Sequence, residues 1–150
     1  TLSEAPHIEM SPFSQALKNG AKPRHLPNLK AGSWVYGSFS TWIGDVDKNL
    51  GWDLLVNAKK AYDQAKLNGQ LSQKDLLAAT EQLAICEGSD WFWWFGDYNP
   101  SGSVRDFDRL YRRHLTKLYQ LINVTPPSAL DHPVSVGGGD MENAGTMRRN

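Results

Sequence analysis

The sequence has little cysteine, no net charge and no long apolar run. Its single cysteine, Cys86, excludes an internal disulfide, and its 16 basic residues balance its 16 acidic residues. Without a basic excess or cluster, we expect neither nucleic acid nor an anionic membrane as a partner. No stretch approaches the roughly 18 consecutive apolar residues of a membrane span. These absences predict a protein of a reducing, aqueous compartment, and we expect a cytoplasmic location.

Metal-ligand patterns are also absent from the sequence. Its four histidines are dispersed without an HExxH motif or paired spacing, and one cysteine cannot organise a structural zinc site. We therefore expect neither a metal nor a cofactor. The chain begins at Thr1 without an initiator methionine or the pattern of a signal peptide, which predicts a fragment of a longer protein.

The length of 150 residues is that of one ordinary domain. Residues 1–45 are expected to form an irregular arm and an aromatic loop, because four prolines limit helix extension before residue 31. In the loop, residues 32–44, glycine and serine separate the aromatic residues, a pattern typical of segments that line a ligand. These aromatic residues are Trp34, Tyr36, Phe39 and Trp42.

Residues 46–130 are predicted to form a mainly α fold, a bundle of about three helices. Apolar positions recur at three- and four-residue intervals over residues 46–68. Two further helices are expected, at residues 72–87 and from Ser103 to the proline pair that begins at Pro126. Three amphipathic helices bury their apolar faces by packing together.

The end of the chain has a different composition. Residues 131–150 contain three consecutive glycines and few apolar side chains. Such a segment cannot bury enough apolar surface to offset the entropy lost on ordering, so we expect a flexible tail.

Two short motifs flank the first two expected helices. Residues 32–44 read GSWVYGSFSTWIG, and residues 87–94 read EGSDWFWW. Together they resemble the late part of glycoside hydrolase family 57. In that family a segment like the first approaches the active-site cleft, and a Ser-Asp-Trp segment like the second is the last of five signature regions. The resemblance covers the chain from its start to about residue 130.

The resemblance implies an incomplete (β/α)7 barrel that carries a carboxy-terminal helical bundle, and this chain would be the bundle without the barrel. It also implies a retaining hydrolase or glucanotransferase that acts on α-glucan oligosaccharides or polysaccharides. Such an enzyme needs two carboxyl groups about 5 Å apart. The family's catalytic glutamate and aspartate regions would lie before Thr1. We therefore assign no catalytic residue to this chain and expect the missing amino-terminal barrel as its partner.

The candidate substrate-binding residues are four. The resemblance places a substrate-contacting tryptophan at Trp91, and an indole face matches the apolar face of a pyranose ring. Burial in the bundle core is the alternative for Trp91, and we favour the sugar contact. Asp90 accepts hydrogen bonds from sugar hydroxyls in one interpretation and caps the following helical turn in the other. For Trp34 and Trp42, lining the cleft and packing against the barrel both stay open.

Other prominent residues are expected to be structural. For Phe92, Trp93 and Phe95 we favour burial in the bundle core, which contributes on the order of 2 kcal/mol per ring. Consecutive aromatic residues on a helix point in every direction, so some rings should still reach a cleft or a neighbouring domain. The cationic pair Arg112-Arg113 is expected on the solvated face of the third helix.

Two hypotheses of different classes follow. The first is the helical part of a family 57-like enzyme, which completes a substrate cleft. The alternative is a non-catalytic carbohydrate-binding or protein-docking helical module that uses its exposed aromatic face alone. Coding sequence upstream of Thr1 distinguishes them, because barrel strands with a carboxylate-bearing region there favour the first.

Overall fold

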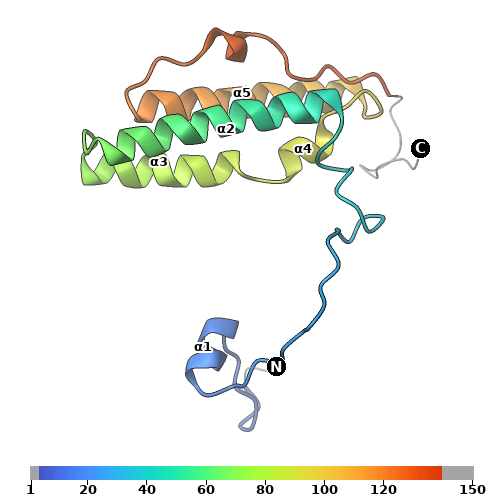
Figure 1. Ribbon diagram of the computed structural model, residues 1–150, viewed down its shortest axis with the longest axis vertical. Helices are drawn as coiled ribbons and strands as arrows, with labels where there is room; N and C mark the ends of the chain where they lie inside the picture. The colour runs from blue at the N-terminus through green and yellow to red at the C-terminus, as the bar shows by residue number, and fades with distance from the viewer. Residues whose placement is uncertain (1–3, 140–150) are drawn as a thin grey trace. The chain divides into compact units, whose positions relative to one another are not determined.

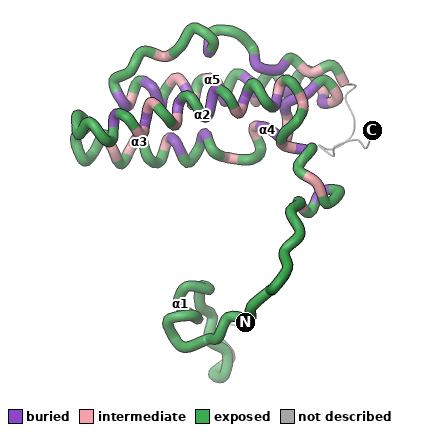
Figure 2. Tube along the Cα trace, viewed as in Figure 1, coloured by how far each residue is buried: buried purple, intermediate pink, exposed green. Residues whose placement is uncertain are grey.

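The computed structural model describes residues 4–139 (Figure 1). The chain divides into two units, residues 1–32 and residues 33–150. The one α-helix among the described residues of the first unit is α1, Phe13–Lys18. None of the described residues of this unit is buried (Figure 2). The first unit is therefore a short helix with irregular flanks and has no apolar core in its described part.

The second unit is a helical bundle, which confirms the predicted mainly α class. The long helices α2, α3 and α5 lie side by side (Figure 1), and α5 packs against both α2 and α3. A 3-10 helix, η2, follows the last long helix, and the described residues form no strand. The elements are α2, Val46–Leu67; α3, Gln73–Cys86; α4, Asp90–Trp94; α5, Ser101–Leu121; and η2, Ser128–Asp131.

The starts of α2 and α3 follow from local sequence. The Asp45 carboxylate accepts a hydrogen bond from the backbone N–H of Asp47 at 2.9 Å, and the Ser72 hydroxyl accepts one from Asp75 at 3.1 Å. Each bond satisfies an N–H group that the first helical turn leaves unpaired. Gly69, with a φ of 64°, takes the left-handed conformation that ends α2. The predicted bounds of both helices agree with the structure within one residue.

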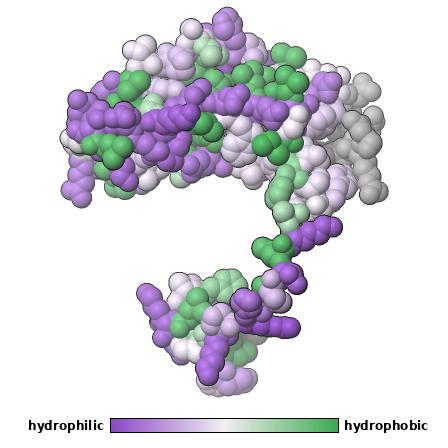
Figure 3. Space-filling view, viewed as in Figure 1, coloured by the Kyte–Doolittle hydropathy of each residue, from purple (hydrophilic) through white to green (hydrophobic). Residues whose placement is uncertain are grey.

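The core lies between the three long helices. Tyr111, Leu115 and Leu118 of α5 are fully buried, as is Cys86 at the end of α3. Tyr111 also donates its hydroxyl hydrogen to the Gly51 carbonyl oxygen of α2 at 2.8 Å, so its polar atom is satisfied inside the core. On the face of the bundle that Figure 3 turns to the viewer, most residues are hydrophilic and apolar residues are interspersed among them.

Within the described part of the chain, no helix is both long and apolar enough to cross a lipid bilayer.

The segment after α5 returns along the bundle and is fixed by a buried carboxylate. Asp108 of α5 is 2% exposed and accepts hydrogen bonds from the backbone N–H groups of Val134 at 2.6 Å and Ser135 at 3.4 Å. Arg112 donates to the other Asp108 carboxylate oxygen at 2.8 Å and to the Leu130 carbonyl oxygen at 2.9 Å. One aspartate and one arginine therefore connect α5 to the chain that follows it.

These contacts correct two expectations. Residues 131–139 are packed, with Val134 and Ser135 buried, whereas a flexible tail was expected from residue 131; residues 140–150 of that tail lie outside the described residues. Arg112, expected on a solvated face, is half-buried beside Asp108. Both expectations relied on composition. Hydrogen bonds between backbone groups and a buried charge order a segment whatever its apolar content.

Replacing Asp108 with Ala should therefore destabilise the fold. The substitution removes the hydrogen-bond acceptor of the Val134 N–H group and the carboxylate partner of the Arg112 guanidinium, and we expect the unfolding free energy to fall by about 3 kcal/mol. Urea denaturation followed by circular dichroism measures the change. Asp106→Ala is the matched control on the same helix, because its pair with Arg109 is 4.0 Å long and exposed. A similar loss in both variants would contradict the assignment.

Candidate functional site

The aromatic residues of α4 and its end point in different directions and contact different elements. Phe92 and Phe95 are fully buried, which agrees with the core interpretation for these two rings. Gly51 of α2 allows them to approach closely, because a Cβ atom there would lie 2.9 Å from the Phe95 ring. Trp94 stacks on Phe107 of α5 with ring centroids 5.0 Å apart. The aromatic run therefore joins α4 to both α2 and α5.

Lys48 of α2 holds two carbonyl groups of this run. Its side chain is fully buried, and its Nζ atom donates to the carbonyl oxygens of Phe92 at 2.5 Å and Phe95 at 2.7 Å. The Tyr98 ring centroid lies 5.1 Å from the same nitrogen. These carbonyls belong to the end of a helix, where they have no intrahelical partner. The Lys48 side chain of α2 therefore caps the carboxy-terminal end of α4.

Burial lowers the pKa of Lys48 to about 8, and the carboxylates of Asp45 and Asp47 oppose this change. The neutral amine still carries two N–H donors, enough for both carbonyl bonds. The hydrogen bonds to α4 therefore do not require the charge. Burial destabilises the charged form relative to the neutral form, which is why the pKa is lowered.

Asn99 binds the carbonyl groups of the two residues between Phe92 and Phe95. Its side-chain nitrogen donates to the carbonyl oxygens of Trp93 at 3.2 Å and Trp94 at 2.9 Å. The backbone carbonyl oxygen of Asn99 accepts hydrogen bonds from the backbone N–H groups of Gly138 at 3.2 Å and Gly139 at 3.0 Å. Two buried side chains from different parts of the chain therefore satisfy all four carbonyl groups of residues 92–95.

Ser135 adds a link between the turn after α4 and α2. Its hydroxyl accepts a hydrogen bond from the Gly96 N–H at 3.0 Å and donates to the Asp47 carboxylate at 2.7 Å. Ser135 is buried, and its bond with Gly96 lies out of water, whereas its bond with Asp47 is partly buried. The returning carboxy-terminal segment thus helps to fix the backbone that carries the aromatic run.

Trp93 is the member of the run that faces the loop before α2. The Trp34 ring stacks on it at 5.6 Å with an interplanar angle of 22°, and the Trp42 ring meets it edge-on at 5.4 Å. Trp34 remains 83% exposed, so much of its ring faces solvent. We call Trp34, Trp42 and Trp93 the aromatic platform.

The loop that carries Trp42 is anchored to α2. The Trp42 carbonyl oxygen accepts a hydrogen bond from the Trp52 indole at 2.8 Å, and the Trp52 ring stacks on Phe92 at 3.9 Å. The Gly44 N–H donates to the Asn49 side chain at 2.9 Å. The indole nitrogen of Trp42 itself is buried and has no hydrogen-bond partner among the described residues. An unsatisfied buried donor is costly.

The structure separates the four predicted site residues into two groups. Trp34 and Trp42 come together on Trp93. Trp91 lies against α5, with its ring 5.7 Å from that of Tyr111, and its indole nitrogen donates to the Ile85 carbonyl oxygen at 2.8 Å. That ring is half-buried, whereas Asp90 is exposed at the start of α4.

Sequence reasoning missed the roles of Trp93, Lys48 and Asn99. Trp93 was expected in the core and is instead half-exposed beneath Trp34, because adjacent rings on one helical turn cannot share one environment. A signal existed for Lys48. It lies three residues before Gly51 and seven before Leu55, on the buried stripe of α2, where a lysine needs a partner. No comparable sequence signal identifies Asn99.

In the part of the chain that the structure describes, no group of three or more histidine, cysteine, aspartate or glutamate side chains is placed to hold a metal ion. Comparisons of the chain with protein-family models, with curated proteins and with solved structures found no match.

The Lys48 contact predicts how stability depends on pH. In the unfolded chain the ammonium keeps its proton up to its ordinary pKa of 10.5, whereas the folded protein releases it near pH 8. Between these values the unfolded state binds more protons, so the unfolding free energy rises with pH. From pH 7.5 to 9, wild type should gain about 1 kcal/mol relative to Lys48→Met. Urea denaturation at each pH measures the difference.

Other titrating groups are present in both proteins, and buried groups that titrate above pH 9 in the folded protein do not change its charge over this range. They include Cys86 and Tyr98, whose pKa values burial raises to about 11 and about 12. Lys60→Met removes an exposed lysine from the same helix and should follow the wild-type curve. Parallel curves for wild type and Lys48→Met would contradict the buried-ammonium assignment.

Proposed function

We propose that this chain is the carboxy-terminal helical part of a retaining glycoside hydrolase or glucanotransferase that acts on α-glucans, and that the aromatic platform contacts the glucan. One observation carries the proposal. The two stretches on which the family 57 resemblance rests, residues 32–44 and 87–94, meet through the rings of Trp34, Trp42 and Trp93. Stretches that contact one substrate must lie together, although about fifty residues separate them along the chain.

The chemistry of the platform suits a sugar. The exposed Trp34 ring offers a flat apolar surface that can cover the C–H face of a pyranose. The ring is supported from behind by Trp93, whose backbone carbonyl is held by Asn99. A supported ring loses little conformational freedom on binding, so more of the stacking energy contributes to affinity.

Asp90 and Trp91 stay in the proposal as further contacts. No hydrogen bond or ion pair engages the Asp90 carboxylate within the described residues, and that carboxylate is exposed. Trp91 offers only the exposed part of its ring, because Tyr111 and Ile85 engage the remainder. We therefore rank Trp34 above Trp91 as the principal sugar contact.

Catalysis is assigned to the parent protein and not to this chain. A retaining mechanism needs a nucleophilic and a proton-donating carboxyl group about 5 Å apart. In the proposal the barrel supplies both, and the bundle supplies binding surface. No cofactor takes part, and the proposed location is the cytoplasm.

Replacing Trp34 with Ala tests the sugar contact. Because Trp34 is 83% exposed, its loss should leave the fold intact while removing a stacking surface. We expect maltohexaose affinity to fall about tenfold, which corresponds to about 1.4 kcal/mol of lost stacking energy. Titration of the full chain, followed by tryptophan fluorescence and by NMR of the indole N–H groups, measures the affinity.

Phe13→Ala is the matched control, because it removes an aromatic side chain that is 93% exposed on α1. Cellohexaose, with the same sugar units in β-linkage, is the control ligand. Circular dichroism should show the same helix content in all variants. Absence of maltohexaose binding by the wild type at millimolar concentration, or equal affinity of the Trp34 variant, would reject the platform.

A protein-docking module is the second candidate, and a specific feature favours it. Apolar side chains are exposed on the stretch from the aromatic loop into the start of α2, beyond what sugar contact requires. Such a surface is typical of a site that another protein or domain covers. The side chains are Phe39 at 50% exposed, Ile43 at 49%, Val46 at 81% and Leu50 at 43%.

This surface predicts self-association of the isolated chain. The double substitution Phe39→Ser with Ile43→Ser should shift sedimentation from oligomers towards monomer, because it removes exposed apolar area without altering the buried core. Leu67→Ser with Leu77→Ser is the control, since both leucines are exposed on other stretches of the bundle. A monomeric wild type at high concentration would count against a docking surface.

A further inference from the structure

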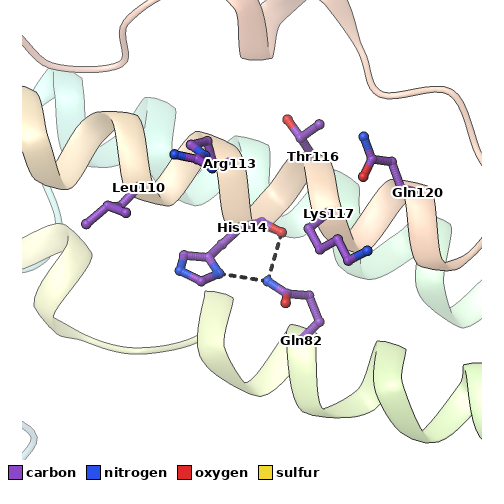
Figure 4. Close-up of a pocket in the computed structure, with 7 residues that line it drawn as sticks. All are labelled: Gln82, Leu110, Arg113, His114, Thr116, Lys117 and Gln120. Atoms are coloured by element: carbon purple, nitrogen blue, oxygen red, sulfur yellow. Dashed lines mark hydrogen bonds between the residues drawn. The ribbon is translucent and has the colours of Figure 1, made fainter.

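A polar pocket lies on the bundle beside α5, built from residues outside the aromatic platform (Figure 4). Its volume is about 540 Å³, within the usual range for small-molecule sites. Figure 4 shows Gln82 reaching from α3 to His114 of α5, with the other lining residues along the same stretch of α5. The lining residues are Gln82, Leu110, Arg113, His114, Thr116, Lys117 and Gln120, and no carboxylate is among them.

The cations of this pocket differ from their neighbours on the same helix. Arg109 and Arg112 pair with the carboxylates of Asp106 and Asp108. Arg113 and Lys117, one turn apart, make no ion pair with any described residue. Two like charges at this spacing repel each other and destabilise the helix slightly. An anion bound between them would remove that repulsion.

The remaining lining groups can recognise hydroxyls. The Gln82 side-chain nitrogen donates to the His114 Nδ1 atom at 2.9 Å and to the His114 carbonyl oxygen at 3.0 Å, which leaves its side-chain oxygen as an acceptor. Thr116 donates its hydroxyl hydrogen to the Arg112 carbonyl oxygen at 2.8 Å, so its hydroxyl oxygen also accepts. Gln120 contributes an amide at the same pocket.

We propose that this pocket binds the phosphate group of a small hydroxylated compound through Arg113 and Lys117. A phosphate monoester carries close to two negative charges at neutral pH, which balances the two unpaired cations, whereas a carboxylate balances one. Guanidinium and ammonium groups donate several N–H bonds to phosphate oxygens. The acceptors on Gln82 and Thr116 then face hydroxyl groups of the ligand. The site is independent of the glucan proposal, since it shares no residue with the aromatic platform.

Calorimetric titration of the full chain at low ionic strength tests the pocket. The probes are inorganic phosphate, glycerol 3-phosphate and glucose 6-phosphate, with glucose and sodium chloride of equal ionic strength as blanks. The double substitution Arg113→Gln with Lys117→Gln should weaken phosphate-ester binding at least about tenfold, because two charge-assisted contacts are lost. Side-chain amide signals of Gln82 and Gln120 should shift in NMR spectra on binding.

Arg105→Gln with Arg109→Gln is the matched control, since it removes two exposed cations at the same spacing on the same helix but outside the pocket. Its affinity should stay within about twofold of wild type. Tighter binding of the esters than of inorganic phosphate supports the proposed phosphorylated, hydroxylated ligand. Equal binding of ester and inorganic phosphate would overturn the hydroxyl contacts of Gln82 and Thr116, and no binding of any probe by the wild type would overturn the site. Equal losses in the two double variants, or a response to sodium chloride alone, would overturn it.

Discussion

The arrangement of this protein depends on a buried lysine side chain, whose nitrogen holds α4 in its charged or its neutral form. Lys48 is enclosed between α2 and α4, and a charged group without water is tolerated only where hydrogen bonds replace its hydration. The carbonyl oxygens of Phe92 and Phe95 supply those bonds. The same contact satisfies carbonyls that the end of a short helix leaves unpaired. Two requirements of different origin are therefore met at one place, and the position of α4 follows from them.

The other polar contacts extend this arrangement through the carboxy-terminal segment. Asn99 binds the intervening carbonyls, Ser135 connects Gly96 to Asp47, and Asp108 fixes the backbone near residue 134. Each group is buried and has its partner, so the network specifies one backbone path where apolar packing alone would allow several. A helix of five residues is too short to be stable by itself. Its rings keep fixed directions because Lys48 and Asn99 bind its carbonyl groups and Ser135 binds the backbone just after it.

The structure offers two surfaces of different chemistry. The aromatic platform presents an exposed indole supported by a second ring, whereas the pocket beside α5 presents cations and amides. Trp91 of α4 contacts the wall of the pocket, because its ring centroid is 5.5 Å from that of His114, which lines the pocket. The helix that supports the platform is therefore in contact with the pocket wall. Stacking and ion pairing respond differently to salt, so the two surfaces can be studied separately.

The mainly helical class and the bounds of α2 and α3 follow from local sequence, because apolar periodicity and the caps at Asp45 and Ser72 act over a few residues. The sequence also determined that the rings of residues 91–95 could not share one environment. Which ring is exposed depends on three-dimensional packing, because Lys48 and Asn99 set the direction of α4. Lys48 lies 44 residues before Phe92, and Asn99 lies six residues after Trp93. The packing of residues 131–139 was likewise decided by a distant buried carboxylate. Composition does not reveal such contacts, because each joins one particular side chain to one particular backbone group, and those of Lys48 and Asp108 join residues 44 and 26 positions apart.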